Sequence, residues 1–124
     1  MSGDRSQIRS FRDLRAWQLA FQLGLDVYRE TESFPQDERF GLTAQIRRSA
    51  ISVASNIAEG YGRGSTSDYV RFLRIARGSL HELETQLMFA RELRLLEPAH
   101  CEALLRSADD AGRVLGGLIR SISR

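Results

Sequence analysis

Apolar residues recur every three or four positions along most of this chain, which is the period that places side chains on one face of a helix. No segment alternates apolar and polar residues with the period of two that a half-buried strand shows. The pattern therefore predicts an all-α protein. The clearest run belongs to the C-terminal segment and consists of Cys101, Leu104, Ala108, Ala111, Leu115, Leu118 and Ile122.

Turn and capping residues divide the chain into an N-terminal arm and four helical segments. We expect a flexible arm over residues 1–12 and a bundle over residues 13–124, with helices at about 13–31, 36–59, 66–94 and 98–122. Gly60 stands where the second helix is expected to be capped, because a C-terminal cap favours glycine. The expected helix starts are marked by two capping-box pairs, Ser10 with Asp13 and Ser65 with Asp68, and by two prolines, Pro35 and Pro98.

Helices of this length joined by short loops favour an antiparallel up-down-up-down four-helix bundle. The first segment carries two apolar stripes, which is more apolar surface than one bundle core can cover. We therefore expect Trp17 and Phe21, which lie on one of these stripes, to be shared between the core and a subunit interface. The second segment is rich in alanine and serine, and such small residues let neighbouring helices approach closely. Together these features predict a homo-oligomer.

The composition excludes several classes of protein. Cys101 is the only cysteine, so the chain has no internal disulfide and no metal site built from several cysteines. The longest apolar runs are only a few residues, which predicts neither a membrane span nor a secretory signal and favours a cytoplasmic protein. All 18 basic residues are arginine, and the formal net charge is +2. Arginine suits bidentate recognition of phosphate and equally suits pairing with carboxylates between helices.

The arginines of the second and third segments have two interpretations. In the first interpretation, these arginines contact nucleic acid or a partner. The glycine-rich loop at residues 60–64 precedes a helix start, and there Arg63 supplies charge and Tyr61 supplies a stacking face. Alternatively, the glycines only end a helix, and the arginines pair with carboxylates such as Asp68 on a solvated face. The candidate contact residues are Arg47, Arg48, Tyr61, Arg63, Arg71, Arg74 and Arg77.

Four further polar residues lie on the same two segments, namely Asn56, Glu59, Glu82 and Glu84. We expect them to make inter-helix or inter-subunit contacts that fix the register of the helices, since arginine and carboxylate counts are well matched. A surface that binds a partner is the alternative. The residues alone do not separate the two.

No constellation of residues predicts an active site. A di-metal carboxylate bundle needs Glu-x-x-His on two helices, and the one such string, Glu97 to His100, falls in a loop and a first turn. His81 has no second histidine at metal-ligand spacing, and a thiol nucleophile at Cys101 has only His100 nearby, which is expected to point to a different face. We therefore expect no enzyme, no metal, no cofactor and no small-molecule substrate.

Three stretches carry a resemblance to a known family: LTAQIRRSA at residues 42–50, SNIAEG at residues 55–60, and the residues Gly78, Ser79, Leu80, Glu82, Leu83, Glu84, Thr85, Gln86 and Leu87. They resemble the bacterial four-helix-bundle proteins often encoded inside 23S rRNA intervening sequences, over residues 11 to 96. The chain is also similar to the accessory variability proteins of diversity-generating retroelements, which associate with nucleic acid and a reverse transcriptase. The resemblance implies a cytoplasmic ring of five subunits, a homopentamer, and it implies no enzymatic activity.

These observations predict a non-catalytic oligomeric scaffold or binding protein. It is expected to associate with RNA or another nucleic acid through arginine-rich surfaces. The alternative is a protein-interaction module that recruits a nucleic-acid enzyme without contacting nucleic acid itself. The expected partners are therefore other copies of the chain, RNA, or a nucleic-acid-processing protein, and no membrane.

Overall fold

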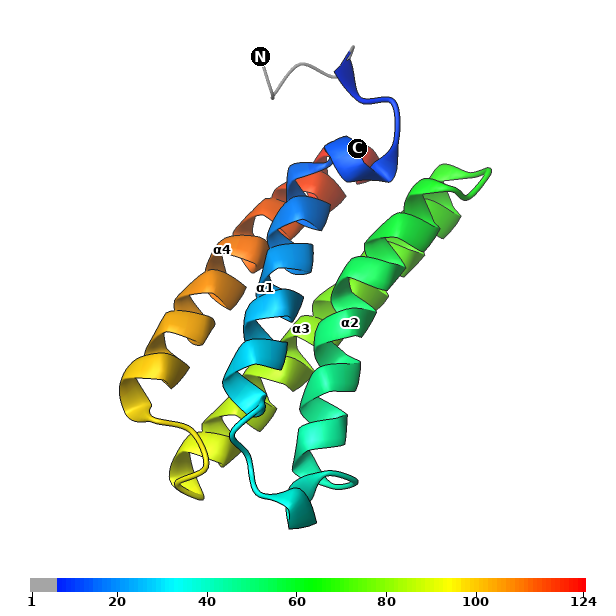
Figure 1. Ribbon diagram of the computed structural model, residues 1–124. Coiled ribbons are helices and arrows are strands. Elements are labelled where there is room, and N and C mark those ends of the chain that lie inside the picture. Colours follow the sequence, from blue (N-terminus) through cyan, green and yellow to red (C-terminus); the bar gives the residue numbers. More distant parts are fainter. Residues whose placement is uncertain (1–6) are drawn as a thin grey trace.

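The computed structural model describes residues 7–124, and this part of the chain contains helices and no strand. The elements are the 3-10 turns η2 (Phe11–Asp13) and η3 (Gln36–Glu38) and the helices α1 (Arg15–Thr31), α2 (Leu42–Tyr61), α3 (Thr66–Glu92) and α4 (Pro98–Ser123) (Figure 1). The prediction of an all-α protein with four main helices is confirmed. Residues 1–6 of the expected arm lie outside the described residues, whereas Ile8 and Phe11 pack against the core.

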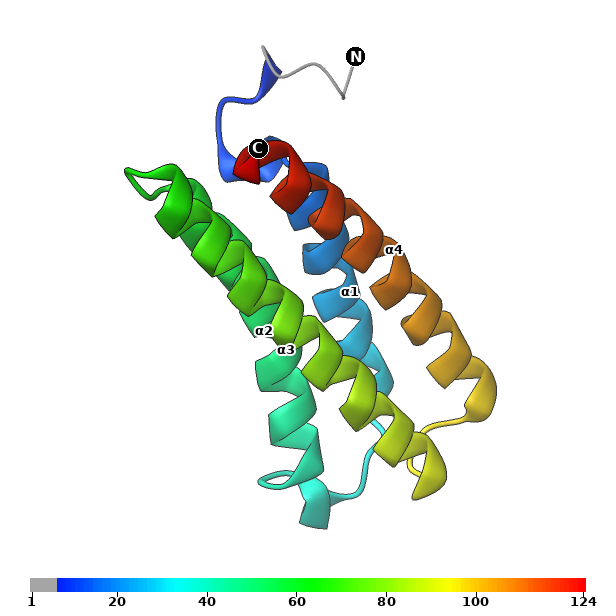
Figure 2. The same cartoon turned by 180° about the vertical axis from the view of Figure 1, so that it is seen from behind.

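The four α-helices pack side by side around one core. The most extensive contact joins α2 to α3, while α1 packs on both α2 and α4, and α3 packs on α4. Figures 1 and 2 show the loops from α1 to α2 and from α3 to α4 at one end of the molecule. The loop from α2 to α3, the start of α1 and the C-terminus lie at the other end.

Every α-helix contributes buried side chains to this core, which explains why all four segments show the helical period. Burial of a large aliphatic side chain stabilises a fold by about 1.5–3 kcal/mol relative to leaving it exposed. The largest fully buried side chains are Leu23 and Val27 of α1, Ile46, Val53 and Ile57 of α2, Leu73, Leu80, Leu83 and Leu87 of α3, and Cys101 and Leu115 of α4.

The second helix begins later than the sequence pattern predicts. The residues after Pro35 form only the short turn η3, and Gly41 then leaves helical geometry with φ −101° and ψ −113°. The backbone N–H of Leu42, the first residue of α2, donates to the Glu38 carboxylate at 3.3 Å. The prediction that a continuous helix starts at residue 36 is therefore wrong, and residues 39–41 form a loop.

Gly60 is not the cap of α2. The helix continues through Tyr61, and Gly62 takes the capping position. A Cβ added at Gly60 would meet the Phe72 Cβ at 2.8 Å, which is closer than packed carbon atoms approach. The absence of a side chain at Gly60 therefore allows the close crossing of α2 and α3, and the helix-capping prediction for this residue is wrong.

The other predicted start signals are present, with one shift of position. Ser10 and Asp13 form a capping box, but it closes the turn η2, and α1 begins only after the extended residue Leu14. The Ser65 hydroxyl accepts the N–H of Asp68 at 3.2 Å and caps α3. Pro98 occupies the first turn of α4. No helix among the described residues is long and apolar enough to cross a membrane.

Candidate functional site

Arginine and aromatic side chains gather beside the first turns of α2. We call this the arginine–aromatic surface and define it by Tyr28, Arg39, Phe40, Arg47 and Arg48. These residues line one open hollow of about 610 Å³. Tyr28 comes from α1, Arg39 and Phe40 from the loop after η3, and Arg47 and Arg48 from α2. The surface therefore joins two of the predicted contact residues to three that the sequence analysis did not select for contact.

Arg47 is held in place by the rest of the protein. Its Nε donates to the Thr31 hydroxyl at 2.8 Å, and a terminal nitrogen donates to the Tyr28 carbonyl oxygen at 3.3 Å. Its guanidinium carbon also lies 4.5 Å from the centroid of the Tyr28 ring. A guanidinium has five N–H donors, so fixed donors are left over that can bind an anion.

Arg39 and Phe40 are two of the three residues of this surface that sequence reasoning missed. Phe40 is 84% exposed, and the Arg39 guanidinium carbon lies 4.7 Å from the centroid of its ring. The missed signal was an aromatic residue next to an arginine in a loop, and it was hidden because residues 36–59 were expected to form one helix. An aromatic ring so exposed gains little from the fold itself, since it covers almost no core.

The arginines of this surface have no carboxylate partner among residues 7–124. The ion pairs in that part of the chain involve other arginines, and Arg39, Arg47 and Arg48 belong to none of them. Arg48 lines a second small hollow together with Glu82 of α3, but the two side chains form no ion pair. The charge of the three guanidinium groups is therefore left available to a ligand.

The predicted contact residues around the α2–α3 loop are largely occupied. Arg63 pairs with Glu59 at 3.1 Å and Arg71 pairs with Asp68 at 3.4 Å. Both guanidinium groups lie over the Phe72 ring, at 4.5 and 4.7 Å from its centroid. The pairing of Arg71 with Asp68 agrees with the solvated-face interpretation of these arginines.

Tyr61 contributes to packing at the same end of the molecule. Its ring meets the Tyr69 ring edge-on, with centroids 6.1 Å apart, and packs against the core. Burial, followed by the effect of Tyr61, raises the pKa of Tyr69 to about 12. The tyrosine pair therefore serves the fold, and the structure does not leave Tyr61 free as an exposed stacking face.

Arg74 and Arg77 also lack an ion-pair partner within the described part of the chain, but their surroundings differ. Arg77 lines a hollow between α3 and α4 together with the acidic residues Glu84 and Asp109. Burial raises the pKa of Glu84, the nearby His81 lowers it, and Asp109 raises it further. The carboxylates beside Arg77 make this hollow a weaker site for an anion than the arginine–aromatic surface.

The polar residues expected between helices follow two patterns. Asn56 donates to the Ser52 carbonyl and hydroxyl oxygens at 2.9 Å, within α2, while the Ser52 hydroxyl contacts that of Ser79 at 2.9 Å across to α3. Glu59 pairs with Arg63, four residues along the chain, instead of with another helix. The inter-helix contact is therefore made by the two serines, and contacts of these residues between subunits stay a prediction.

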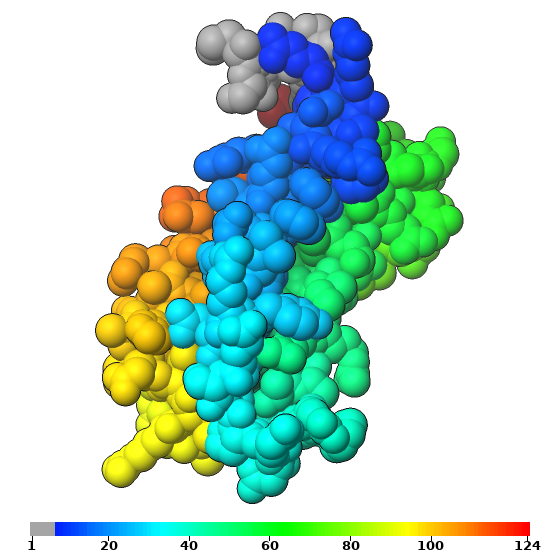
Figure 3. All heavy atoms as spheres, in the orientation of Figure 1, coloured from blue at the N-terminus to red at the C-terminus, as the bar shows by residue number. Residues whose placement is uncertain are grey.

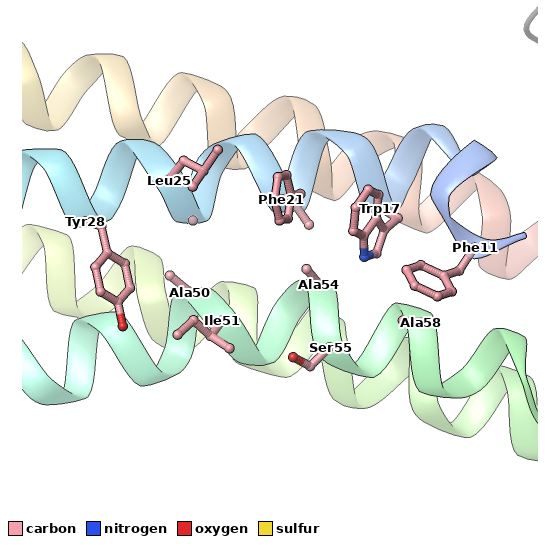
Figure 4. A pocket seen from close by; sticks show the side chains of 12 residues that line it. Phe11, Trp17, Phe21, Leu25, Tyr28, Ala50, Ile51, Ala54, Ser55 and Ala58 are labelled. Atoms are coloured by element: carbon pink, nitrogen blue, oxygen red, sulfur yellow. The ribbon is translucent and has the colours of Figure 1, made fainter.

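An apolar groove runs between α1 and α2, on the face shown with all atoms in Figure 3. Its volume is about 510 Å³. Trp17 and Phe21 stack with ring centroids 4.8 Å apart and an interplanar angle of 18°. In Figure 4 these rings lie along α1, and the small side chains of Ala54 and Ala58 face them from α2. Trp17 packs against the core, whereas Phe21 is 48% exposed.

The groups that could support chemistry are few in residues 7–124. No cluster of three or more histidine, cysteine or acidic side chains could hold a metal ion there. The Cys101 thiol is buried, lies 3.5 Å from the Leu87 carbonyl oxygen, and has a pKa raised mainly by burial, which favours the unreactive thiol form. His100 contacts Glu30 at 3.0 Å.

The structure defines an all-α protein of four packed helices with a basic surface and an apolar groove. The chain belongs to the family of 23S rRNA-intervening sequence proteins, which it matches over residues 12–117. A crystal structure of a protein of unknown function from the S23 ribosomal protein family of Bacteroides thetaiotaomicron VPI-5482 has the same fold, with a TM-score of 0.79. The two chains share 19% identity, and the match covers 85% of this chain and 95% of the other. No curated protein matches the chain.

Proposed function

We propose that this chain is a non-catalytic, cytoplasmic binding protein that associates with RNA as a ring-like homo-oligomer of antiparallel up-down-up-down bundles. The observation that carries the proposal is the arginine–aromatic surface, where three arginines without carboxylate partners among the described residues line one hollow. Guanidinium groups bind phosphate through paired N–H donors. The family description, 23S rRNA-intervening sequence protein, is consistent with an RNA partner.

The apolar groove supports the oligomer. Four large side chains that line this groove are between 39% and 50% exposed, namely Phe21, Leu25, Tyr28 and Ile51. A contiguous apolar patch of this kind usually marks an interaction site. A second copy of the chain is the occupant that we propose, because the resemblance implies a homopentamer and the small residues of α2 allow a neighbouring helix to approach closely.

An oligomer would also strengthen RNA binding. Net charge is only +2 per chain, so one copy exerts a weak overall attraction on a polyanion. A ring repeats the arginine–aromatic surface once in every subunit, and several weak contacts on one RNA add through effective concentration. The proposal therefore links the groove, which assembles the subunits, to the arginines, which bind RNA.

The direct test is the affinity for a structured RNA with single-stranded loops, measured at two salt concentrations. Each phosphate contact releases counterions, so we expect affinity to fall steeply as salt rises, with a logarithmic slope of about −0.7 to −0.9 per contact. No binding near physiological salt, or binding indifferent to salt, would contradict the proposal. A pull-down after nuclease treatment tests the alternative, since a module that recruits a nucleic-acid enzyme by protein contacts alone would keep its partner.

A further inference from the structure

We propose that the arginine–aromatic surface binds a single-stranded nucleic-acid segment, with one base stacked on Phe40 and the adjoining phosphates held by Arg39 and Arg48. This inference rests on the proposed function and gives it a specific site. It differs from the sequence-based expectation, which included the glycine-rich loop and the row of arginines on α3. The structure moves the centre of binding to the start of α2.

The stacking face is provided by Phe40. One side of its ring is covered by the Arg39 guanidinium, and the residue is nevertheless 84% exposed. Every nucleobase has a flat π face, and stacking on an aromatic side chain contributes about 1–3 kcal/mol per base. A base in a duplex is already stacked and paired, so an exposed ring of this kind favours a single strand.

The phosphate contacts come from the arginines around the same hollow. Arg47 is fixed by Thr31 and Tyr28 and needs no reorganisation to present its remaining N–H groups. Arg39 and Arg48 are exposed and have no ion-pair partner within residues 7–124. The first N–H of α2 is already met by the Glu38 carboxylate at 3.3 Å, so the arginines supply the positive charge of this site.

The wall of the same hollow includes a buried polar side chain. Thr43 lies in the first turn of α2, is 6% exposed and lines the hollow. Its hydroxyl oxygen has no hydrogen-bond partner among the described residues. Because this oxygen is itself buried, it offers no contact to a ligand in the hollow, and the site rests on Phe40 and the arginines.

The experiment compares single substitutions by fluorescence anisotropy. The probes are an unstructured RNA of about ten nucleotides, a DNA of the same sequence, and linear polyphosphate, which has no bases. The variants are Phe40→Ala and Arg48→Gln. Arg106→Gln is the matched control, because it removes the same charge from an exposed position on α4 that does not line the hollow.

We expect Phe40→Ala to weaken RNA binding about tenfold while leaving polyphosphate binding unchanged, because only the stacking contact is lost. Arg48→Gln should weaken binding of both probes and reduce the salt slope by about 0.7. Arg106→Gln should match the wild type. The DNA probe shows whether the ribose hydroxyl contributes, since equal affinity for both strands would assign recognition to bases and phosphates alone and support the stated contacts.

Several outcomes would overturn the inference. If the wild type binds RNA but Phe40→Ala and Arg48→Gln behave like Arg106→Gln, the site is wrong while the proposed function stands. If the wild type binds the structured RNA but not the unstructured one, this inference fails alone; if it binds neither, the proposed function fails with it. If Phe40→Ala loses RNA binding and light scattering shows that it has also lost the oligomer, then Phe40 is a subunit contact and the inference is wrong. Because Phe40 and Arg48 are exposed, neither substitution should unfold the chain.

Discussion

A single residue, Tyr69, should make the free energy of unfolding depend measurably on pH. Its phenol releases a proton near 10.0 in an unfolded chain, whereas burial and Tyr61 raise the pKa to about 12 in the folded protein. Between these values the unfolded state binds fewer protons than the folded state, so the free energy of unfolding should decrease as pH rises. The contribution is fully present below pH 10.

Replacing Tyr69 by phenylalanine tests this effect, because the ring is kept and the ionisable group is removed. We expect denaturant unfolding to show a smaller loss of stability between pH 10 and pH 12 in Tyr69→Phe than in the wild type. Parallel pH profiles for the two proteins would show that Tyr69 is not responsible.

Sequence reasoning succeeded for residues whose partners are close along the chain. Asp68 and Arg71 are three positions apart, and their pairing could be expected from the helical period alone. Arg47 and Thr31 are 16 positions apart, and their hydrogen bond depends on how α1 and α2 pack. The candidate site could therefore be predicted only in part, because its geometry arises from packing between elements.

At the scale of elements, α3 depends on its buried face more than on its exposed one. Leu83 is 0% exposed, and its replacement by alanine should lower the free energy of unfolding by about 2–5 kcal/mol through lost burial and a cavity. Leu93, on the other hand, is 59% exposed at the end of the helix. Leu93→Ala is the matched control and should cost less than about 0.5 kcal/mol in denaturant unfolding. Equal losses would contradict the assignment of the core.

The element boundaries show where local patterns mislead. The apolar and polar positions after residue 36 fit a helix, but Gly41 and the Glu38 carboxylate place the start of α2 at Leu42. The competing signals are all local, and the spacing of apolar residues alone does not rank them. The consequence is functional, because the loop that replaces the expected first turns exposes Phe40 and Arg39.

At the scale of the whole molecule, the groove predicts that assembly can be broken without unfolding the bundle. Phe21 is 48% exposed, so Phe21→Glu should place a charge in the proposed interface while the core stays intact. Phe89→Glu is the control, since Phe89 is 59% exposed but lies on α3, away from the groove. Native mass spectrometry should show smaller assemblies for Phe21→Glu only. Unchanged assembly would remove the groove from the interface.

Native mass spectrometry of the wild-type chain mixed with a structured RNA shows whether the chain binds RNA as an oligomer. The chain mass is 14.0 kDa, and we expect an ion that contains several subunits, five by the family resemblance, together with RNA. A free 14.0 kDa monomer at micromolar concentration, or an oligomer that never carries RNA at low salt, would contradict it.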